Sequence, residues 1–224
     1  MRAPRALLAA FALAVVLDLA CLAAGLHTGH AAAKVLLMPL LAASAARAGA
    51  PRLLVAALLC GWGGDVLLLS DAGPAFMAGM ASFAAGHVCY LVLFHRVRRQ
   101  GPPRARARLL ALAYAAALVT LVLLLWPDLP AGLRVPVAGY STLLTAMAYT
   151  AAGRLGPVAG FGGALFMLSD TLIATGVADW PQLPRPDFWI MLTYAAAQFL
   201  LVRGTLDARR APATAYREVR STTP

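Results

Sequence analysis

Eight long apolar segments constrain this sequence more than any other feature. Short turns containing glycine, proline or charged residues separate these segments, which cover approximately residues 6–25, 32–47, 52–70, 75–95, 107–126, 133–151, 157–177 and 187–205. A helix that spans a bilayer needs about 20 mostly apolar residues, and irregular backbone cannot face lipid. The sequence therefore predicts an all-α, polytopic membrane protein with about eight transmembrane helices.

The overall composition agrees with this class. Hydrophobic residues make up 61% of the 224 residues and charged residues only 12%, which is about half the charged fraction of a soluble domain. This composition excludes a secreted disulfide scaffold, a disordered chain and an ordinary cytosolic enzyme. The three cysteines all lie in apolar segments, and we interpret them as small core residues rather than as a disulfide framework or a metal site.

The basic residues indicate the orientation. The net charge is +10, and of the 19 Lys and Arg residues 16 fall on the side that both termini share in an eight-span topology. Because cytoplasmic loops are enriched in basic residues, we expect an integral protein of a bacterial inner (cell) membrane with both termini in the cytoplasm. The six arginines of residues 96–108 are expected to anchor the loop at lipid headgroups, so the bilayer and not nucleic acid is the predicted partner.

We expect one transmembrane domain, residues 1–205, followed by a polar, disordered tail, residues 206–224. The first segment also resembles a signal peptide, but Asp18 would interrupt its apolar core, which favours a retained span.

Residues 61–71 and 160–170 agree at six of eleven positions, so the sequence predicts two parallel four-helix halves. The Gly-x-Gly-Gly pattern in both segments is typical of close helix packing.

Ionisable residues inside spans are costly and are the first functional candidates. The sequence offers five of them, namely Asp18, Lys34, Asp65, His87 and Asp170. Asp65 and Asp170 fall at similar depths on outward-running helices, so they could share a proton or take opposite acid and base roles. The alternative is that each carboxyl group bonds a nearby hydroxyl and only fixes helix packing.

His87 lies on a helical stripe with Phe76, Gly79, Phe83 and Tyr90, because these residues are three or four apart. The stripe could line a polar cavity, or His87 could be a packing residue. Counted from the turn, His87 lies about 12 Å deeper than the aspartate of the preceding span, so contact between them would require tilt, a water or a broken helix.

Asp18 and Lys34 flank the first turn and are expected to pair, although Lys34 could also hold a phosphate headgroup. A zinc site built from Asp65, His87 and Asp170 is disfavoured because it contains only one histidine. We therefore expect no metal and no cofactor.

Three motifs resemble those of the YhhN-like lysoplasmalogenase family, in the same order and at similar spacing. They are Gly64-Asp65-Val66-x-Leu68, the stripe from Phe76 to Tyr90, and Gly163-Ala164-Leu165-Phe166-x-x-Ser169-Asp170. One departure is that Lys34 and Pro39 are separated here, whereas many members have a Lys-Pro step.

The resemblance implies an integral membrane hydrolase that cleaves the vinyl-ether bond of a lysophospholipid. The products would be a fatty aldehyde and glycerophosphoethanolamine or glycerophosphocholine. It also implies catalytic and substrate-binding residues: Asp65, His87 and Asp170 for catalysis, and Lys34, Phe83, Tyr90 and Ser169 for binding.

Acid hydrolysis of a vinyl ether needs a carboxylic acid that protonates the β-carbon and a carboxylate that stabilises the resulting cation or activates water. Glycosidases use two carboxylates in a similar way. Our hypothesis takes Asp170 as the acid, Asp65 as the counter-charge or base and His87 as the residue that orients water, and the swapped assignment of the two acids is equally open. The rival interpretations are a small proton-coupled transporter that uses the same acids and a scaffold with a packed polar network.

Overall fold

The residues that the structure describes form eight helices. A computed structural model describes the backbone of residues 2–70, 72–97 and 104–221 and the side chains within residues 5–210. The helices are α1 (Arg2–Ala24), α2 (His27–Arg47), α3 (Arg52–Leu67), α4 (Gly73–Arg96), α5 (Arg104–Leu125), α6 (Ala131–Arg154), α7 (Pro157–Val177) and α8 (Pro186–Ser221).

Each predicted apolar segment corresponds to one of these helices, which confirms the all-α, polytopic membrane class. Six helices are long and apolar enough to cross a membrane, namely α1, α2, α4, α5, α7 and α8. Helix α3 has only 16 residues, about four fewer than a perpendicular span requires, because it ends at Leu67 rather than at residue 70. Helix α6 has 24 residues, but threonines, glycines and an internal proline make it less apolar.

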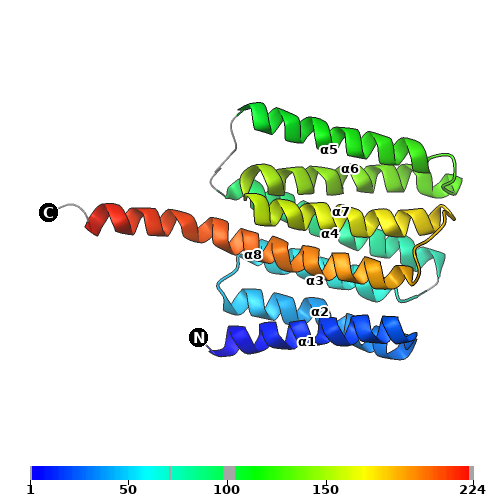
Figure 1. The fold of residues 1–224 in the computed structure, drawn as a ribbon, viewed down its shortest axis with the longest axis horizontal. Coiled ribbons are helices and arrows are strands. Elements are labelled where there is room, and N and C mark those ends of the chain that lie inside the picture. The colour runs from blue at the N-terminus through cyan, green and yellow to red at the C-terminus, as the bar shows by residue number, and fades with distance from the viewer. Residues whose placement is uncertain (1, 71, 98–103, 222–224) are drawn as a thin grey trace.

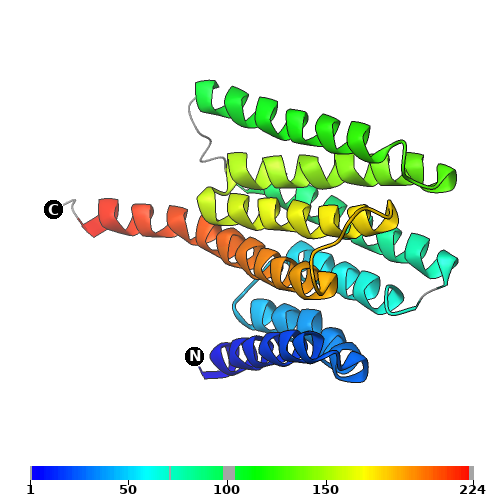
Figure 2. The same cartoon turned by 45° about the vertical axis from the view of Figure 1, so that its right-hand side comes forward.

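The helices form two groups that meet in the middle of the molecule (Figures 1 and 2). Within the first group α1 packs on α2, α2 on α3 and α3 on α4, and the second group repeats this order from α5 to α8. Helix α4 also packs against α6, and α8 also packs against α1 and α2. The fourth helix of each group thus lies at the centre, while α1 and α5 form the two outer edges. This is the arrangement expected for two parallel four-helix halves.

Helix α1 begins and helix α8 ends on the same side of the bundle (Figure 1), as an even number of spans requires. Helix α8 continues to Ser221 and so includes most of the residues that the sequence sets apart as a polar tail. The division into a membrane domain and a tail stays a prediction.

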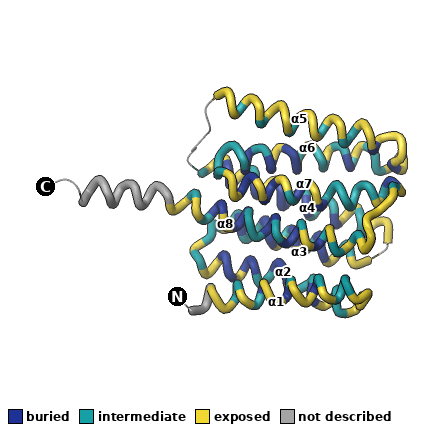
Figure 3. Tube along the Cα trace, viewed as in Figure 1, coloured by how far each residue is buried: buried dark blue, intermediate teal, exposed yellow. Residues whose placement is uncertain are grey.

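Burial is greatest where the central helices meet, and the outer helix α5 is mostly exposed (Figure 3). The glycine motifs allow this central packing. A Cβ atom added to Gly64 would lie 2.4 Å from the ring of Phe83, and one added to Gly163 would lie 2.8 Å from the Cα atom of Ala148. The predicted packing role of the two glycine motifs is therefore confirmed. The three cysteines are free thiols.

Candidate active site

The first polar network joins α4, α6 and α7. Asp170 on α7 accepts a hydrogen bond at Oδ2 from the hydroxyl group of Tyr140 on α6. The Tyr140 oxygen lies 3.1 Å from Nε2 of His87 on α4. Since a hydroxyl group has one proton, which Tyr140 donates to Asp170, its oxygen accepts from His87 Nε2–H. The result is a directed chain of donors from His87 through Tyr140 to Asp170.

His87 is held firmly in this chain. Its side chain is 1% exposed, and its ring packs edge-on against Phe166 at a centroid distance of 4.8 Å. The Nδ1 atom is buried without a hydrogen-bond partner among the described residues. The sequence indicates that His87 lies deeper than Asp65, and the structure agrees, because the histidine bonds Tyr140 and through it reaches the other aspartate.

The second network joins α3, α4 and α8. Asp65 on α3 is 2% exposed and accepts a 2.8 Å hydrogen bond at Oδ2 from the hydroxyl group of Tyr194. Gln198, one turn further along α8, donates to the Tyr194 oxygen at 3.3 Å and accepts from the Tyr90 hydroxyl group at 2.6 Å. This chain of donors also ends on a carboxyl group, and it runs from Tyr90 through Gln198 and Tyr194 to Asp65.

Aromatic rings separate the two networks. The Phe166 ring packs edge-on against Tyr194 at 5.5 Å and against Phe83 at 6.4 Å, and it also contacts His87. The two carboxyl groups therefore have separate hydrogen-bond partners, although they remain close enough to interact electrostatically. Among the described residues, no three His, Cys, Asp or Glu side chains come together as metal ligands would.

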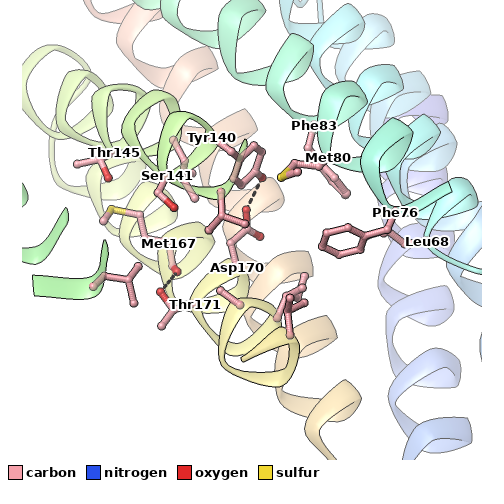
Figure 4. Close-up of a pocket in the computed structure, with 16 residues that line it drawn as sticks. Leu68, Phe76, Met80, Phe83, Tyr140, Ser141, Thr145, Met167, Asp170 and Thr171 are labelled. Carbon is pink, nitrogen blue, oxygen red and sulfur yellow. Dashed lines mark hydrogen bonds between the residues drawn. The ribbon is translucent and has the colours of Figure 1, made fainter. Parts of the chain in front are cut away.

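An apolar pocket reaches one of the two carboxyl groups. The pocket has a volume of about 710 Å³ including its mouth, lies between α4, α5, α6 and α7, and is lined mainly by Leu, Phe, Met and Val side chains. Asp170 and Tyr140 lie on its wall, linked by their hydrogen bond, and Phe83 lies opposite them (Figure 4). Asp65 and His87 do not line this pocket. Its lining includes Val177, the last residue of α7, so the pocket extends toward the end of the bundle opposite the start of α1.

The remaining predicted site residues lie elsewhere. Tyr90 belongs to the Asp65 network. Ser169 is buried and donates to the carbonyl group of Ile190 on α8 at 3.1 Å, which is a contact between helices. Lys34 on α2 is half-buried and lies within electrostatic range of Asp65, but it does not line the pocket.

The expected pairing of Asp18 with Lys34 is wrong. Asp18 is 1% exposed and pairs with His30, whose Nδ1 atom lies 2.7 Å from its Oδ1 atom, while Lys34 acts on it only at longer range. His30 is one helical turn closer than Lys34 to the tight turn between α1 and α2, so its shorter side chain reaches the carboxyl group directly.

Three residues of the two networks are not among the candidates that the sequence predicts. They are Tyr140, Tyr194 and Gln198. The i, i+4 spacing of Tyr194 and Gln198 places both on one face of α8, which was an available signal. Tyr140 had no such signal, because a single tyrosine in an apolar helix is usually a packing residue.

A family model matches residues 29–205 of the chain, which is most of the helical bundle and includes both networks. The chain belongs to the YhhN family. The membership agrees with the resemblance of the three motifs, and it makes the chain an integral membrane protein.

Proteins named lysoplasmalogenase are among the relatives of this YhhN family member. The chain is 38% identical over 165 residues to human lysoplasmalogenase TMEM86B, covering 73% of this chain and 66% of the relative. It is 39% identical over 145 residues to the pig protein of the same name, covering 65% and 59%. It is 34% identical over 169 residues to a lysoplasmalogenase of Mycobacterium tuberculosis, covering 72% and 63%. The chain thus spans slightly less than two thirds of the length of these relatives. No solved structure matches it.

Proposed function

We propose that this chain is a lysoplasmalogenase, an ether hydrolase that cleaves the vinyl-ether bond of an alkenyl lysophospholipid. The names of its YhhN-family relatives support this activity. The structural observation that carries the proposal is the Asp170–Tyr140 pair on the wall of an apolar pocket. A carboxyl group on the wall of an apolar pocket is suited to protonate a carbon atom of an alkenyl chain.

The reaction would begin when Asp170 transfers its proton to the β-carbon of the vinyl ether, which leaves an oxocarbenium ion at the α-carbon. Water then adds to the α-carbon and loses a proton to the Asp170 carboxylate, which gives a hemiacetal and restores the acid. The hemiacetal collapses to a fatty aldehyde and the free hydroxyl group of the glycerol backbone. Only the neutral carboxylic acid form of Asp170 can donate this proton.

The networks suggest separate roles for the two acids. The Tyr140 hydroxyl group bonds one oxygen of Asp170 and leaves its other oxygen to carry the proton toward the substrate. Asp65 is buried away from the pocket, receives a hydrogen bond from Tyr194 and lies in the field of Lys34. In the proposed mechanism Asp65 would therefore act on the cation only through space. His87 would act through Tyr140, by fixing the direction in which its hydroxyl proton points.

The location proposed for this enzyme is a bacterial inner membrane, with both termini in the cytoplasm. The arginine distribution supports this orientation. The pocket would then extend into the outer half of the membrane, and a lysophospholipid would be the partner.

The proposed activity is tested by measuring aldehyde release from alkenyl lysophosphatidylethanolamine by the purified protein in detergent. Asp170→Asn, Asp65→Asn and His87→Ala should lose most of the turnover. Asp207→Asn makes the same chemical change at an exposed ion pair with Arg203 and should keep it. Addition of EDTA should have no effect.

The assay also separates the alternatives. Full turnover by both Asp→Asn variants of the networks would refute the two-carboxylate mechanism. Absence of aldehyde from well-folded wild-type protein would refute the hydrolase. Substrate-dependent proton uptake into liposomes would then identify the proton-coupled transporter.

A further inference from the structure

A second polar group lies on the turn between α5 and α6. Arg134 of α6 donates from Nε to the carbonyl oxygen of Leu129 at 3.1 Å and from Nη2 to the carbonyl oxygen of Pro127 at 3.1 Å. These carbonyl groups flank Asp128, whose Oδ2 atom accepts a 2.8 Å hydrogen bond from the indole N–H of Trp180. A guanidinium group, a carboxylate and an indole ring therefore meet at one turn. The mechanism above uses none of them.

This polar group adjoins the pocket. Leu129 and Trp180 belong to an apolar cluster that also contains five residues of the pocket wall, namely Met80, Leu121, Val137, Ala174 and Val177. Arg134 precedes Val137 by three residues on α6, so both lie on the same side of that helix. The pocket wall is thus continuous with an apolar cluster that carries one cation and one anion at its edge.

The spacing along α6 matches the dimensions of a lysophospholipid. Arg134 lies six residues before Tyr140, which corresponds to about 9 Å along the helix axis. Five bonds of the glycerol backbone separate the ether oxygen from the phosphorus atom and span roughly 6 Å when extended, and a charge-assisted hydrogen bond adds about 3 Å. With the vinyl ether at the Asp170–Tyr140 pair, the phosphate group would therefore reach the level of Arg134.

The chemistry of the three side chains matches a zwitterion. A guanidinium group binds phosphate oxygens with directed hydrogen bonds. An ammonium group is attracted both to a carboxylate and to the face of an indole ring. Neither these three side chains nor Lys34 lines the pocket itself, but Lys34 lies on α2, which contributes no residue to the pocket wall. It also lies in the field of two carboxyl groups, those of Asp18 and Asp65.

We propose that Arg134, Asp128 and Trp180 form the headgroup site of this protein, in which Arg134 binds the phosphate group and Asp128 with Trp180 binds the ammonium group of a zwitterionic lysophospholipid. The lipid chain extends into the apolar pocket beside Asp170. The choice of a lysophospholipid as ligand rests on the proposed function, whereas the test below does not require turnover.

The test compares equilibrium binding of two saturated ether lipids to purified protein in detergent. Alkyl lysophosphatidylethanolamine and the alkylglycerol of the same chain differ only in the phosphoethanolamine group, and neither contains a vinyl ether. Wild-type protein should bind the phospholipid about tenfold more tightly or better. Arg134→Gln should remove this preference and leave the affinity for alkylglycerol unchanged. Lys34→Gln should keep the preference, and free inorganic phosphate should not displace the lipid.

Asp128 is tested with alkyl lysophosphatidic acid, which has the phosphate group but no ammonium group. Wild-type protein should prefer the ethanolamine lipid over this one. Asp128→Asn should abolish that preference, while its amide oxygen can still accept the hydrogen bond from Trp180.

Three results would overturn the proposal. They are equal wild-type affinity for alkyl lysophosphatidylethanolamine and alkylglycerol, an unchanged phosphate preference in Arg134→Gln, and displacement of the lipid by inorganic phosphate alone. If Arg134→Gln also loses alkylglycerol binding, the variant is uninformative and the wild-type protein is tested instead. Its arginine side chains are modified with phenylglyoxal in the presence of each lipid, and the modified residues are identified by mass spectrometry. Alkyl lysophosphatidylethanolamine, but not alkylglycerol, should then protect Arg134, with Arg185 as the control site. Equal protection by both lipids would refute the headgroup site, whether or not the protein releases aldehyde.

Discussion

Replacement of Tyr140 by phenylalanine tests the Asp170 network most directly. The substitution keeps the ring between α6 and the pocket and removes only the hydroxyl group. Two hydrogen bonds disappear together, one to the Asp170 carboxyl group and one from His87 Nε2. We expect a large loss of turnover and a smaller loss of stability.

The magnitudes follow from these contacts. A hydrogen bond to a charged group contributes about 1.5–3 kcal/mol, so its full loss in the transition state would lower kcat roughly tenfold to a hundredfold. His87 would then be a buried ring with no partner at either nitrogen atom, because Nδ1 already has none among the described residues. Leaving a buried polar atom unsatisfied costs about 1–3 kcal/mol of unfolding free energy.

The assay combines aldehyde release with thermal unfolding in detergent for Tyr140→Phe, His87→Ala and the double variant. Because both residues act through one chain of hydrogen bonds, the double variant should lose little more activity than the worse single variant. Tyr114→Phe is the matched control, since Tyr114 lies on the outer helix α5 and packs on Tyr149 away from the pocket. Turnover of Tyr140→Phe within twofold of wild type, or fully additive losses in the double variant, would refute the reasoning.

Three further predictions follow from the packing, the second network and the orientation. Gly163→Ala should lower the free energy of unfolding by about 1–3 kcal/mol, because the new Cβ atom would meet the backbone of Ala148; Gly139→Ala on the same bundle has open space and should be neutral or slightly stabilising in urea or thermal melts. Gln198→Leu should lower both turnover and melting temperature, because it leaves the buried Tyr90 hydroxyl group without its acceptor and removes the hydrogen bond that the Tyr194 oxygen accepts; an unchanged kcat would remove this chain of hydrogen bonds from the mechanism. A C-terminal fusion to green fluorescent protein should fluoresce in bacteria while a fusion to alkaline phosphatase stays inactive, and the reverse result would invert the proposed topology.

The helices themselves were predictable because the bilayer leaves few choices. A chain in hydrocarbon must satisfy its own backbone hydrogen bonds, so an apolar segment of sufficient length becomes a helix whatever its neighbours are. The boundaries were predicted within a few residues for most segments for the same reason. The early end of α3 was not predicted, because the apolar run continues past Leu67 and only the turn geometry ends the helix there.

The candidate residues were partly predictable from the free-energy cost of placing polar side chains in a membrane. An aspartate or histidine inside an apolar helix is expensive unless it is paired or used, so Asp65, Asp170 and His87 could be selected directly from the sequence. Their partners could not be selected in this way. A tyrosine is tolerated in an apolar helix without any partner, so Tyr140 and Tyr194 resemble ordinary packing residues until the helices are assembled.

The sequence alone determined the class of protein, the order of the helices and the buried acids, since each of these depends on local composition and on the cost of polar groups in lipid. Only the tertiary structure decided which of the two aspartates each hydrogen-bond donor reaches. His87 bonds to the Asp170 network rather than to Asp65 because α4 packs against α6 as well as α3, and this choice depends on the rotation and depth of whole helices. For the same reason, only the assembled bundle shows that Asp170 reaches the pocket while Asp65 does not.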